Sequence, residues 1–392
     1  MKTVKELVQA YAPHAIEMRC ELHKNPELGY QEFQTTELIR RELTSYGIEI
    51  QELDGVKTGL TAIIRGGRPG KTVGIREDID ALPLVEETGL PCASVNGSAH
   101  ACGHDIHCAS LLLTARVLQD MREELAGNVR LIFQPAEEIG TGAKSVIAAG
   151  IMELEPKCDC IIGFHCSPEI DVGTVGLIVG PANASTDTIN INVVGHGGHG
   201  APPYRCVDPI TSSAYMLTQL QTVVSRENPA VQPAVLTFGT IQGGVANNVI
   251  PAEVKLGGTL RAFNEEGRRK MWDAIRRVAA CSCEAMRAKA IVDIQEGIPC
   301  LLNHAEVIDR LRAAAGTVLG EEHIYNIPTP SPGSDDFALF SQMMPGAQFR
   351  VGTGTEDPQT RIGLHNPKNI FSEEAVAVGA AVMAQYAADY LK

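Results

Sequence analysis

Short apolar runs alternate with longer amphipathic segments in the first and last parts of the chain. The apolar runs predict strands at 72–76, 128–133, 160–164 and 348–352, and a polar cluster follows each of them. The amphipathic segments predict two helices within 1–50 and further helices at 107–122, 143–153, 305–319, 335–342 and 373–390. Because strands and helices alternate, we expect these parts of the chain to form an α/β sheet flanked by helices.

The middle of the chain has a different pattern. It predicts strands at 188–194, 234–238, 253–261 and 290–295, with helices at 208–225 and 265–287. The order strand, helix, strand, strand, helix, strand is that of a ferredoxin-like α+β unit. We therefore expect one domain formed by residues 1–183 and 296–392, interrupted by an inserted domain formed by residues 184–295.

Charge and composition exclude several classes of partner. With 33 Lys and Arg against 47 Asp and Glu, the 392-residue chain carries a formal net charge of −14, which disfavours a nucleic-acid partner. No apolar run approaches the roughly 18 residues that a membrane span needs, and the N-terminus lacks the apolar core of a signal peptide. Eleven cysteines, an odd number without a framework pattern, indicate reduced thiols. We expect a cytoplasmic protein.

The stretch from Ser98 to His107 contains the first candidate chemistry. Cys102 and His104 are separated by one glycine and offer a thiolate and an imidazole, which suit zinc, manganese or a similar divalent ion. The predicted helix begins here, and a helix N-terminus is expected to favour the thiolate form of Cys102. A single Cys-x-His pair is weak evidence, so other ligands must reach it.

Three further candidates follow predicted strands or nearby loops. The segment Gln134-Pro-Ala-Glu-Glu138 offers two adjacent carboxylates, of which one can bind metal while the other acts as a general base. His165 and His365 are the other two. Each has an ordinary structural explanation, namely solvated acids that open a helix, a core histidine and a loop histidine. Taken together, the five candidate ligands exceed the three or four that one catalytic zinc takes, so they favour a two-metal site.

Ordered motifs along almost the whole chain resemble those of the peptidase-family M20 amidohydrolases. The resemblance is to the branch that contains bacterial aminoacylases, hippurate hydrolases and auxin-conjugate hydrolases. The motifs are Leu22-His-Lys-Asn-Pro-Glu-Leu-Gly29, Arg76-Glu-Asp-Ile-Asp-Ala-Leu-Pro83, His100-Ala-Cys-Gly-His-Asp105, Phe133-Gln-Pro-Ala-Glu-Glu138, Gly195-His-Gly-Gly-His-Gly200, Asn248-Val-Ile-Pro251, Gly258-Thr-Leu-Arg261, Ser334-Asp-Asp-Phe337 and Leu364-His-Asn-Pro367. The resemblance implies a metallopeptidase-type mixed sheet with an inserted ferredoxin-like domain.

The resemblance also implies a role for each candidate residue. Cys102 would bridge two divalent metal ions, zinc or manganese with cobalt and nickel as the other candidates. Glu137 would be the general base, and Asp80 would orient a ligating imidazole from outside the ligand set. The inserted domain would form a homodimer, in which His199 reaches the partner's active site while Asn248 and Arg261 meet the substrate's carbonyl or carboxylate. The remaining metal ligands would be His104, Glu138, His165 and His365.

These expectations lead to one function and several alternatives. We expect hydrolysis of an N-acyl amino acid to a free amino acid and a carboxylic acid. A dipeptidase or an N-acetyl-diamino-acid deacetylase of the same family is the close alternative, and a non-catalytic metal-binding protein with this fold is the distant one. The chain departs from the usual family pattern at Glu77, Ile106, Tyr204 and Asp335, where a small residue, glycine, histidine and glutamate are usual. None of these positions is a proposed ligand or the base.

Overall fold

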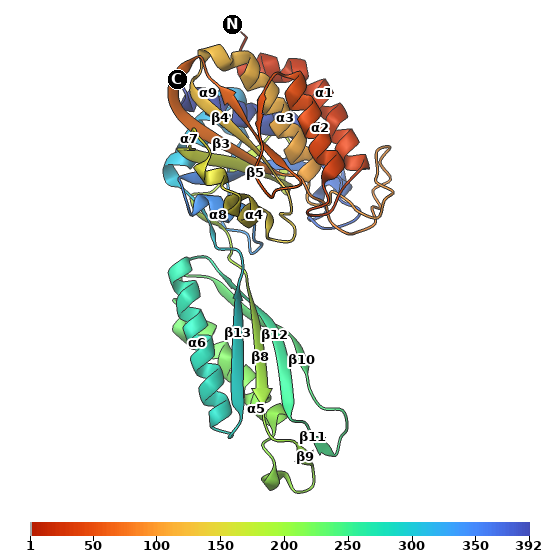
Figure 1. The fold of residues 1–392 in the computed structure, drawn as a ribbon, viewed down its shortest axis with the longest axis vertical. Helices are drawn as coiled ribbons and strands as arrows, with labels where there is room; N and C mark the ends of the chain where they lie inside the picture. The colour runs from red at the N-terminus through yellow and green to blue at the C-terminus, as the bar shows by residue number, and fades with distance from the viewer. Residues whose placement is uncertain (1) are drawn as a thin grey trace. The chain divides into compact units, whose positions relative to one another are not determined.

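The computed structural model describes residues 2–392 and divides them into two compact units. The first unit comprises the chain up to Ala182 together with Leu302–Thr329 and Asp335–Lys392. The second comprises Asn183–Leu301 and Pro330–Ser334. Figure 1 shows the α/β architecture of the first unit and the sheet-and-helix architecture of the second.

An eight-stranded mixed sheet forms the framework of the first unit, in the order β1-β2-β4-β3-β5-β16-β6-β15. The four central strands β4, β3, β5 and β16 are parallel to one another, whereas β2 and β6 pair with their central neighbours in the antiparallel sense. The strands are β1 (Glu49–Gln51), β2 (Leu60–Arg65), β3 (Arg68–Asp78), β4 (Ala126–Gln134), β5 (Cys160–Asp171), β6 (Val175–Leu177), β15 (Ile324–Asn326) and β16 (Gly346–Gly354). The helices are α1 (Val4–Lys24), α2 (Phe33–Ser45), α3 (His104–Met121), α4 (Gly142–Ala148), α7 (Ala305–Val318), α8 (Phe337–Ser341) and α9 (Glu374–Tyr390).

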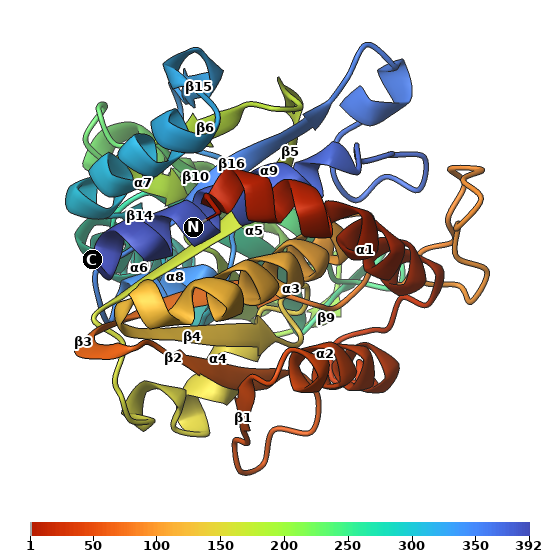
Figure 2. The same cartoon turned by 90° about the horizontal axis from the view of Figure 1, so that it is seen from above.

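Helices cover both faces of this sheet. Phe164 on β5 contacts the position of Gly379 on α9, whereas the preceding residue, Gly163, leaves room for the ring of Phe337 on α8. Successive side chains of a strand point to opposite faces, so α9 and α8 lie on opposite faces of the sheet. Figure 2 shows α1, α3 and α9 running across the same region of the unit.

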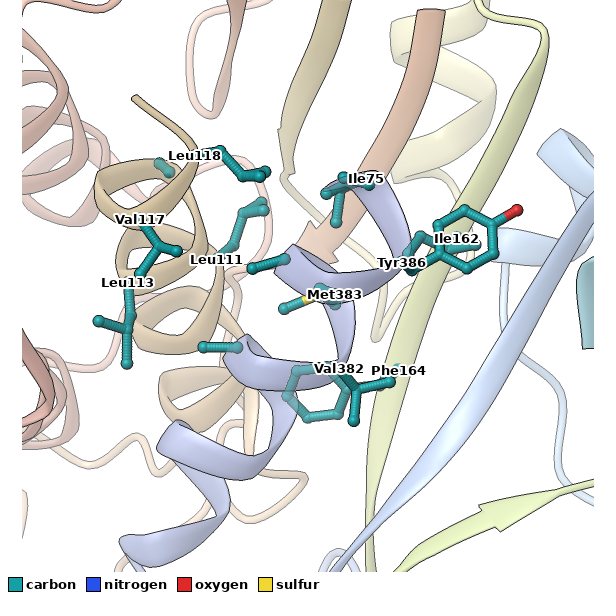
Figure 3. Packing of buried hydrophobic residues seen from close by; sticks show 14 of the residues in the cluster. Ile75, Leu111, Leu113, Val117, Leu118, Ile162, Phe164, Val382, Met383 and Tyr386 are labelled. Carbon is teal, nitrogen blue, oxygen red and sulfur yellow. The ribbon is translucent and has the colours of Figure 1, made fainter. Parts of the chain in front are cut away.

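The main hydrophobic core lies between the sheet and the helices α3 and α9. Figure 3 shows side chains of α3, including Leu111 and Leu118, packed against Met383 of α9 and against Ile75 and Ile162 of the sheet. All five side chains are buried, and such close packing fixes the position of α3 on the sheet. The first residue of α3 is His104, so this core also fixes the position of that imidazole.

The second unit has the strand order β10-β12-β8-β13, and every neighbouring pair is antiparallel. Along the chain its elements follow the order β8, α5, β10, β12, α6, β13, which is the ferredoxin-like arrangement. Alternate residues of β8, such as Ile189 and Ile191, form a second core with both helices. The elements are β8 (Asp187–Val194), β9 (Gly198–His199), α5 (Pro209–Thr222), β10 (Ala234–Gln242), β11 (Val249–Ile250), β12 (Glu253–Ala262), α6 (Glu265–Glu284) and β13 (Lys289–Glu296), and the short strands β7 (Gly180–Asn183) and β14 (Leu301–Asn303) lie where the chain passes between the units.

Within residues 2–392, we find no helix with both the length and the apolar character needed to cross a bilayer.

Candidate metal centre

A sharp turn before α3 brings Cys102 and His104 to the same place. Gly103 has φ of 89°, a left-handed conformation that glycine adopts without strain. A Cβ atom at this position would also lie 2.9 Å from Sγ of Cys166, which is too close. The turn therefore requires glycine, and both flanking ligand candidates are buried.

The two adjacent glutamates after β4 lie on a loop that hydrogen bonds to Glu32 and Asp80 hold in place. Ala136 has φ of 56°, and its N–H donates to Oε1 of Glu32 at 2.8 Å. Beyond it, Glu137 accepts a long hydrogen bond from the N–H of Asp336 at 3.4 Å. The backbone N–H of Glu138 donates instead to Oδ2 of Asp80 at 3.0 Å. The loop that carries both carboxylates is therefore anchored by hydrogen bonds, and one oxygen of each carboxylate lies within 4.8 Å of a ring nitrogen of His104.

The five predicted ligands lie together in the first unit. Sγ of Cys102 is 3.4 Å from Nε2 of His165, and the two carboxylate oxygens of Glu138 lie 3.8 Å from Nε2 of His104 and 3.4 Å from Nε2 of His365. The ligand atoms lie within 4.8 Å of one another in the trio Cys102, His104, His165 and again in the trio Cys102, Glu138, His365. Cys102 is the one residue common to both trios.

Two of the imidazoles present the same nitrogen to this cluster. Nδ1 of His104 lies 2.9 Å from the carbonyl oxygen of Asp80, and Nδ1 of His165 lies 2.8 Å from that of Cys166. A carbonyl oxygen only accepts, so Nδ1 carries a proton in both rings, and in the neutral form of each ring the lone pair of Nε2 is left for a metal ion. This is the arrangement in which histidine binds a metal ion.

The donor set fits divalent metal ions. Nε2 of His104 and Oε1 of Glu138 are buried and have no hydrogen-bond partner. Unpartnered buried polar atoms are costly, and a cation between them would satisfy both. One thiol, one carboxylate and three imidazoles are the ligand types that zinc and similar ions take from proteins.

The second unit contains His199, Asn248 and Arg261. His199 on β9 pairs with Val249 on β11, and the next residue, Gly200, donates its N–H to the carbonyl of Asn248 at 2.8 Å. The structure thus brings the loops of His199 and Asn248 together, and both residues are exposed. Arg261 is apart from them on β12, where its Nη1 donates to Oγ of Ser334 at 3.4 Å.

Comparison with known families identifies the chain. Residues 74–389 match the model of peptidase family M20/M25/M40. The chain belongs to this family. Its members are hydrolases, so this M20 chain is an enzyme of the hydrolase class, and the α/β fold predicted from the sequence is confirmed.

Relatives and solved structures cover nearly the full length of the M20 chain. The N-acetylcysteine deacetylase of Bacillus subtilis is 40% identical over 381 residues, which are 97% of each chain. An IAA-amino acid hydrolase of Arabidopsis thaliana is 34% identical over 95% of this chain and 85% of its own. A crystal structure of a dinuclear metal-binding peptidase of family M20 from Bacillus subtilis is 36% identical, with a TM-score of 0.86 over 98% of this chain and 99% of that one.

Burial and neighbouring acids change the protonation of the candidate base in the M20 chain. Burial raises the pKa of Glu137 well above its usual value, and the carboxylates of Asp335 and Asp336 raise it further. The pKa of Glu138 is also raised, mainly by burial, although His104 acts in the opposite direction. A raised pKa makes this carboxylate a stronger base than an exposed glutamate.

The position of Cys102 at a helix N-terminus does not by itself stabilise the predicted thiolate. Burial raises the pKa of Cys102 well above its usual value, and the charge of Glu138 adds to this effect. The expectation from the sequence was therefore wrong for the protein without metal, because the loss of hydration outweighs the helix dipole. A bound cation is needed to stabilise the thiolate.

The sequence analysis missed a group of buried residues behind the ligands. Asp78 ends β3 and accepts from Nδ1 of His107 at 2.6 Å, while it also lies 3.6 Å from Nε2 of His104. Arg76 donates from Nη1 to Asp78 at 2.8 Å and from Nη2 to Asp336 at 2.6 Å. The available signal was the charged run from Arg76 to Asp80 at the end of an apolar strand. Only Asp80 in this run was chosen as a candidate site residue.

Proposed function

We propose that this M20 chain is a metal-dependent amidohydrolase that cleaves N-acyl amino acids into a free amino acid and a carboxylic acid. The names of two relatives support this substrate class, since one is a deacetylase of an N-acetyl amino acid and the other a hydrolase of an IAA-amino acid. The observation that carries the proposal is Glu137, a buried carboxylate beside the five-residue cluster, whose Oε1 accepts from the N–H of Asp336. A protein that only stored metal would not need this group.

The metal ligands in this proposal are Cys102, His104, Glu138, His165 and His365. Cys102 would be the ligand shared by the two ions, as the family resemblance implies, and it belongs to two of the groups whose ligand atoms lie within 4.8 Å of one another. The ions are zinc or manganese, with cobalt or nickel as the other candidates. When bound, two such ions polarise the amide carbonyl and lower the pKa of water.

Glu137 moves the proton in the reaction. Its carboxylate accepts a proton from the water molecule whose oxygen forms the new bond to the amide carbon. When the carbon–nitrogen bond breaks, Glu137 returns that proton to the leaving amine nitrogen. His199 and Asn248 of the second unit are proposed to stabilise the negative charge that develops on the carbonyl oxygen, and Arg261 to bind the substrate. Asp80 keeps the ring of His104 and the backbone of Glu138 in place.

Replacement of Glu137 by glutamine tests the proposal. E137Q keeps the shape of the side chain but cannot accept the proton, so we expect turnover of an N-acetyl amino acid to fall about 10²- to 10⁴-fold. Metal content, measured by elemental analysis, should not change. The control is E322Q, which alters an exposed glutamate outside the cluster. Unchanged turnover in E137Q would refute the role of Glu137 as base.

A substrate panel separates the alternatives. Acetyl, benzoyl and long-chain acyl amino acids are compared with dipeptides, each with manganese, zinc and cobalt. Preference for dipeptides would identify a dipeptidase, and deacetylation confined to N-acetyl-diamino acids would identify that close alternative. Stoichiometric metal without hydrolysis of any of these amides would favour the non-catalytic metal-binding protein.

We further propose a cytoplasmic homodimer in which His199 completes the partner's active site. H199A alone should then be nearly inactive, as should E137Q alone. In mixed dimers one site contains both intact residues, so mixing the two variants should restore part of the activity. Absence of any recovery, with subunit exchange confirmed by mass spectrometry, would count against a shared site.

A further inference from the structure

The strand β5 carries the proposed ligand His165 beyond the point at which its neighbour β3 stops pairing with it. The parallel register between the two strands ends at Ile75 and Ile162, although β3 continues beside β4 as far as Asp78. His165 lies three residues beyond Ile162 on β5. The buried N–H groups on this edge of β5 therefore need partners other than the main chain of β3.

Two side chains accept hydrogen bonds from the main chain on either side of His165. Oε1 of Glu77 accepts from the N–H of Phe164 at 2.9 Å, and Nε2 of His107 accepts from the N–H of Cys166 at 3.0 Å. All five residues are buried. The main chain around His165 is thus held by one side chain from β3 and one from α3.

The hydrogen bonds of His107 define its protonation. A backbone N–H only donates, so Nε2 must hold a lone pair, and the proton of the ring is on Nδ1. This nitrogen lies 2.6 Å from Oδ1 of Asp78, which accepts from it. Both ring nitrogens of His107 are therefore committed to the protein.

Glu77 is an acid in completely buried surroundings, which needs an explanation. Burial raises the pKa of Glu77 well above its usual value, and the charge of Asp78 raises it further, so the side chain is uncharged near neutral pH. Its Oε2 has no hydrogen-bond partner among residues 2–392. The hydrogen bond from Phe164 to Oε1 is the contact that accounts for a carboxyl group at this position.

The position of the His165 ring depends on this part of the main chain. Its Nδ1 is bound to the carbonyl oxygen of Cys166 at 2.8 Å, which sets the direction of the ring relative to its own peptide. Glu77 and His107 hold the peptide groups on either side and so determine where that peptide lies. A displacement of the peptide would change the distance from Nε2 of His165 to Sγ of Cys102, which is 3.4 Å.

We propose that Glu77 is a positioning residue for metal binding, which holds the main chain of β5 so that His165 lies at the right distance from the other ligands. His107 has the same role on the other side of His165. This inference rests on the metal ligands named in the proposed function and not on the substrate.

The test compares E77M with E77Q in otherwise intact protein. Both side chains have about the length of glutamate, but only glutamine offers an oxygen that can accept from the N–H of Phe164. The zinc affinity of the metal-depleted variants is measured by competition calorimetry with a chelator. We expect E77M to bind zinc about tenfold more weakly than the wild type, and E77Q to stay within about twofold of it.

Bound cobalt gives a second readout that a merely structural role would not change. The visible absorption of Co²⁺ depends on the number and arrangement of its ligands. E77M should change the cobalt spectrum, whereas E77Q should reproduce the spectrum of the wild type. The same spectrum in E77M and the wild type would contradict a displacement of His165.

T61A is the control for a general loss of stability. Thr61 is a buried residue of β2 that donates to the carbonyl oxygen of Leu131 at 2.8 Å, so T61A also removes a side-chain hydrogen bond to a strand of this sheet. It should leave the zinc affinity and the cobalt spectrum unchanged. Unchanged zinc affinity in E77M, an equal loss in T61A, or an equal loss in E77Q would overturn the proposal.

A second pair of variants replaces the first if E77M does not fold. H107Q places an oxygen near the position of Nε2 and can accept from Cys166, whereas H107M cannot, and both lose the hydrogen bond to Asp78. We expect H107M to bind zinc about tenfold more weakly than H107Q. Equal zinc affinities of these two variants would overturn the proposal.

Metal affinity separates this inference from the proposed function. If the wild type binds zinc but hydrolyses no N-acyl amino acid, and E77M binds zinc more weakly, the proposed function fails and the role of Glu77 stands. If the wild type hydrolyses these amides and E77M binds zinc as tightly as the wild type, the role of Glu77 fails and the proposed function stands.

Discussion

Glu32 anchors the loop that carries the proposed base, and its replacement gives a sharp test of the electrostatics. Its side chain is completely buried, with Oε1 accepting from the N–H of Ala136 at 2.8 Å and Oε2 without a partner in the structure. Burial raises the pKa of this carboxyl from about 4.5 to about 7, although hydrogen bonding from Thr58 opposes the shift. The variant E32Q keeps the acceptor for Ala136 and removes the charge.

The shift predicts the size and sign of the effect. Between pH 4.5 and 7 the folded protein holds this proton and the unfolded chain has lost it, so stability falls as the pH rises through this range. A shift from about 4.5 to about 7 corresponds to about 3 kcal/mol. The free energy of unfolding of the wild type thus loses about 3 kcal/mol from this group by pH 8, and E32Q avoids that loss. Relative to the wild type, E32Q should gain about 3 kcal/mol between pH 4.5 and pH 8.

The assay is urea unfolding followed by far-UV circular dichroism, with chelator present so that metal binding does not vary with pH. The quantity compared is the difference between E32Q and the wild type at each pH, which cancels the titration of all other groups. E356Q is the control, because Glu356 is exposed and the variant should show no pH-dependent difference. A difference between E32Q and the wild type that stays constant from pH 4.5 to pH 8 would refute the assigned pKa of Glu32.

Two further predictions concern the ligand support and the second unit. D80A should weaken metal affinity about 10- to 100-fold, because it removes the carboxylate that accepts from the backbone N–H of Glu138. Competition calorimetry with a chelator would measure the affinity, and an unaltered value would contradict this role. R268M should lower the stability of the second unit by about 3 to 5 kcal/mol, because it leaves Asp187 buried without its ion-pair partner. Trp272 is the only tryptophan of the chain and donates to Asp187 at 2.8 Å, so its fluorescence reports the unfolding of this unit. If the free energy of unfolding falls by less than about 1 kcal/mol, this ion pair contributes little to stability.

Local patterns predicted most of the regular structure. The apolar run at 128–133 lies within β4 (Ala126–Gln134), and the helix expected at 265–287 is α6 (Glu265–Glu284). Short peripheral strands such as β1 and β6, three residues each, were not predicted because their pattern is too short to repeat. The segment Pro330–Ser334 belongs to the second unit although it follows a part of the first, and only long-range contacts determine this.

The sequence indicated the candidate metal ligands more clearly than the residues that hold those ligands in place. Cys102 and His165 carry recognisable metal-binding chemistry and follow or lie within predicted elements. Arg76 does not reveal its partners in the same way, because Asp336 lies 260 positions later in the chain. The supporting role of Glu32 likewise depends on a contact across 104 positions. Which acid pairs with which base is a property of the folded chain rather than of any local pattern.

The peptide carbonyls behind His104 and His165 have a consequence for how this site takes up metal. Because the main chain fixes both rings, their rotational freedom is lost when the protein folds and not when a cation arrives. No side-chain substitution removes a carbonyl oxygen, so the directions of these two lone pairs resist mutation. Adaptation to a different metal must therefore change the chemical identity of the ligands and not the orientation of these two rings.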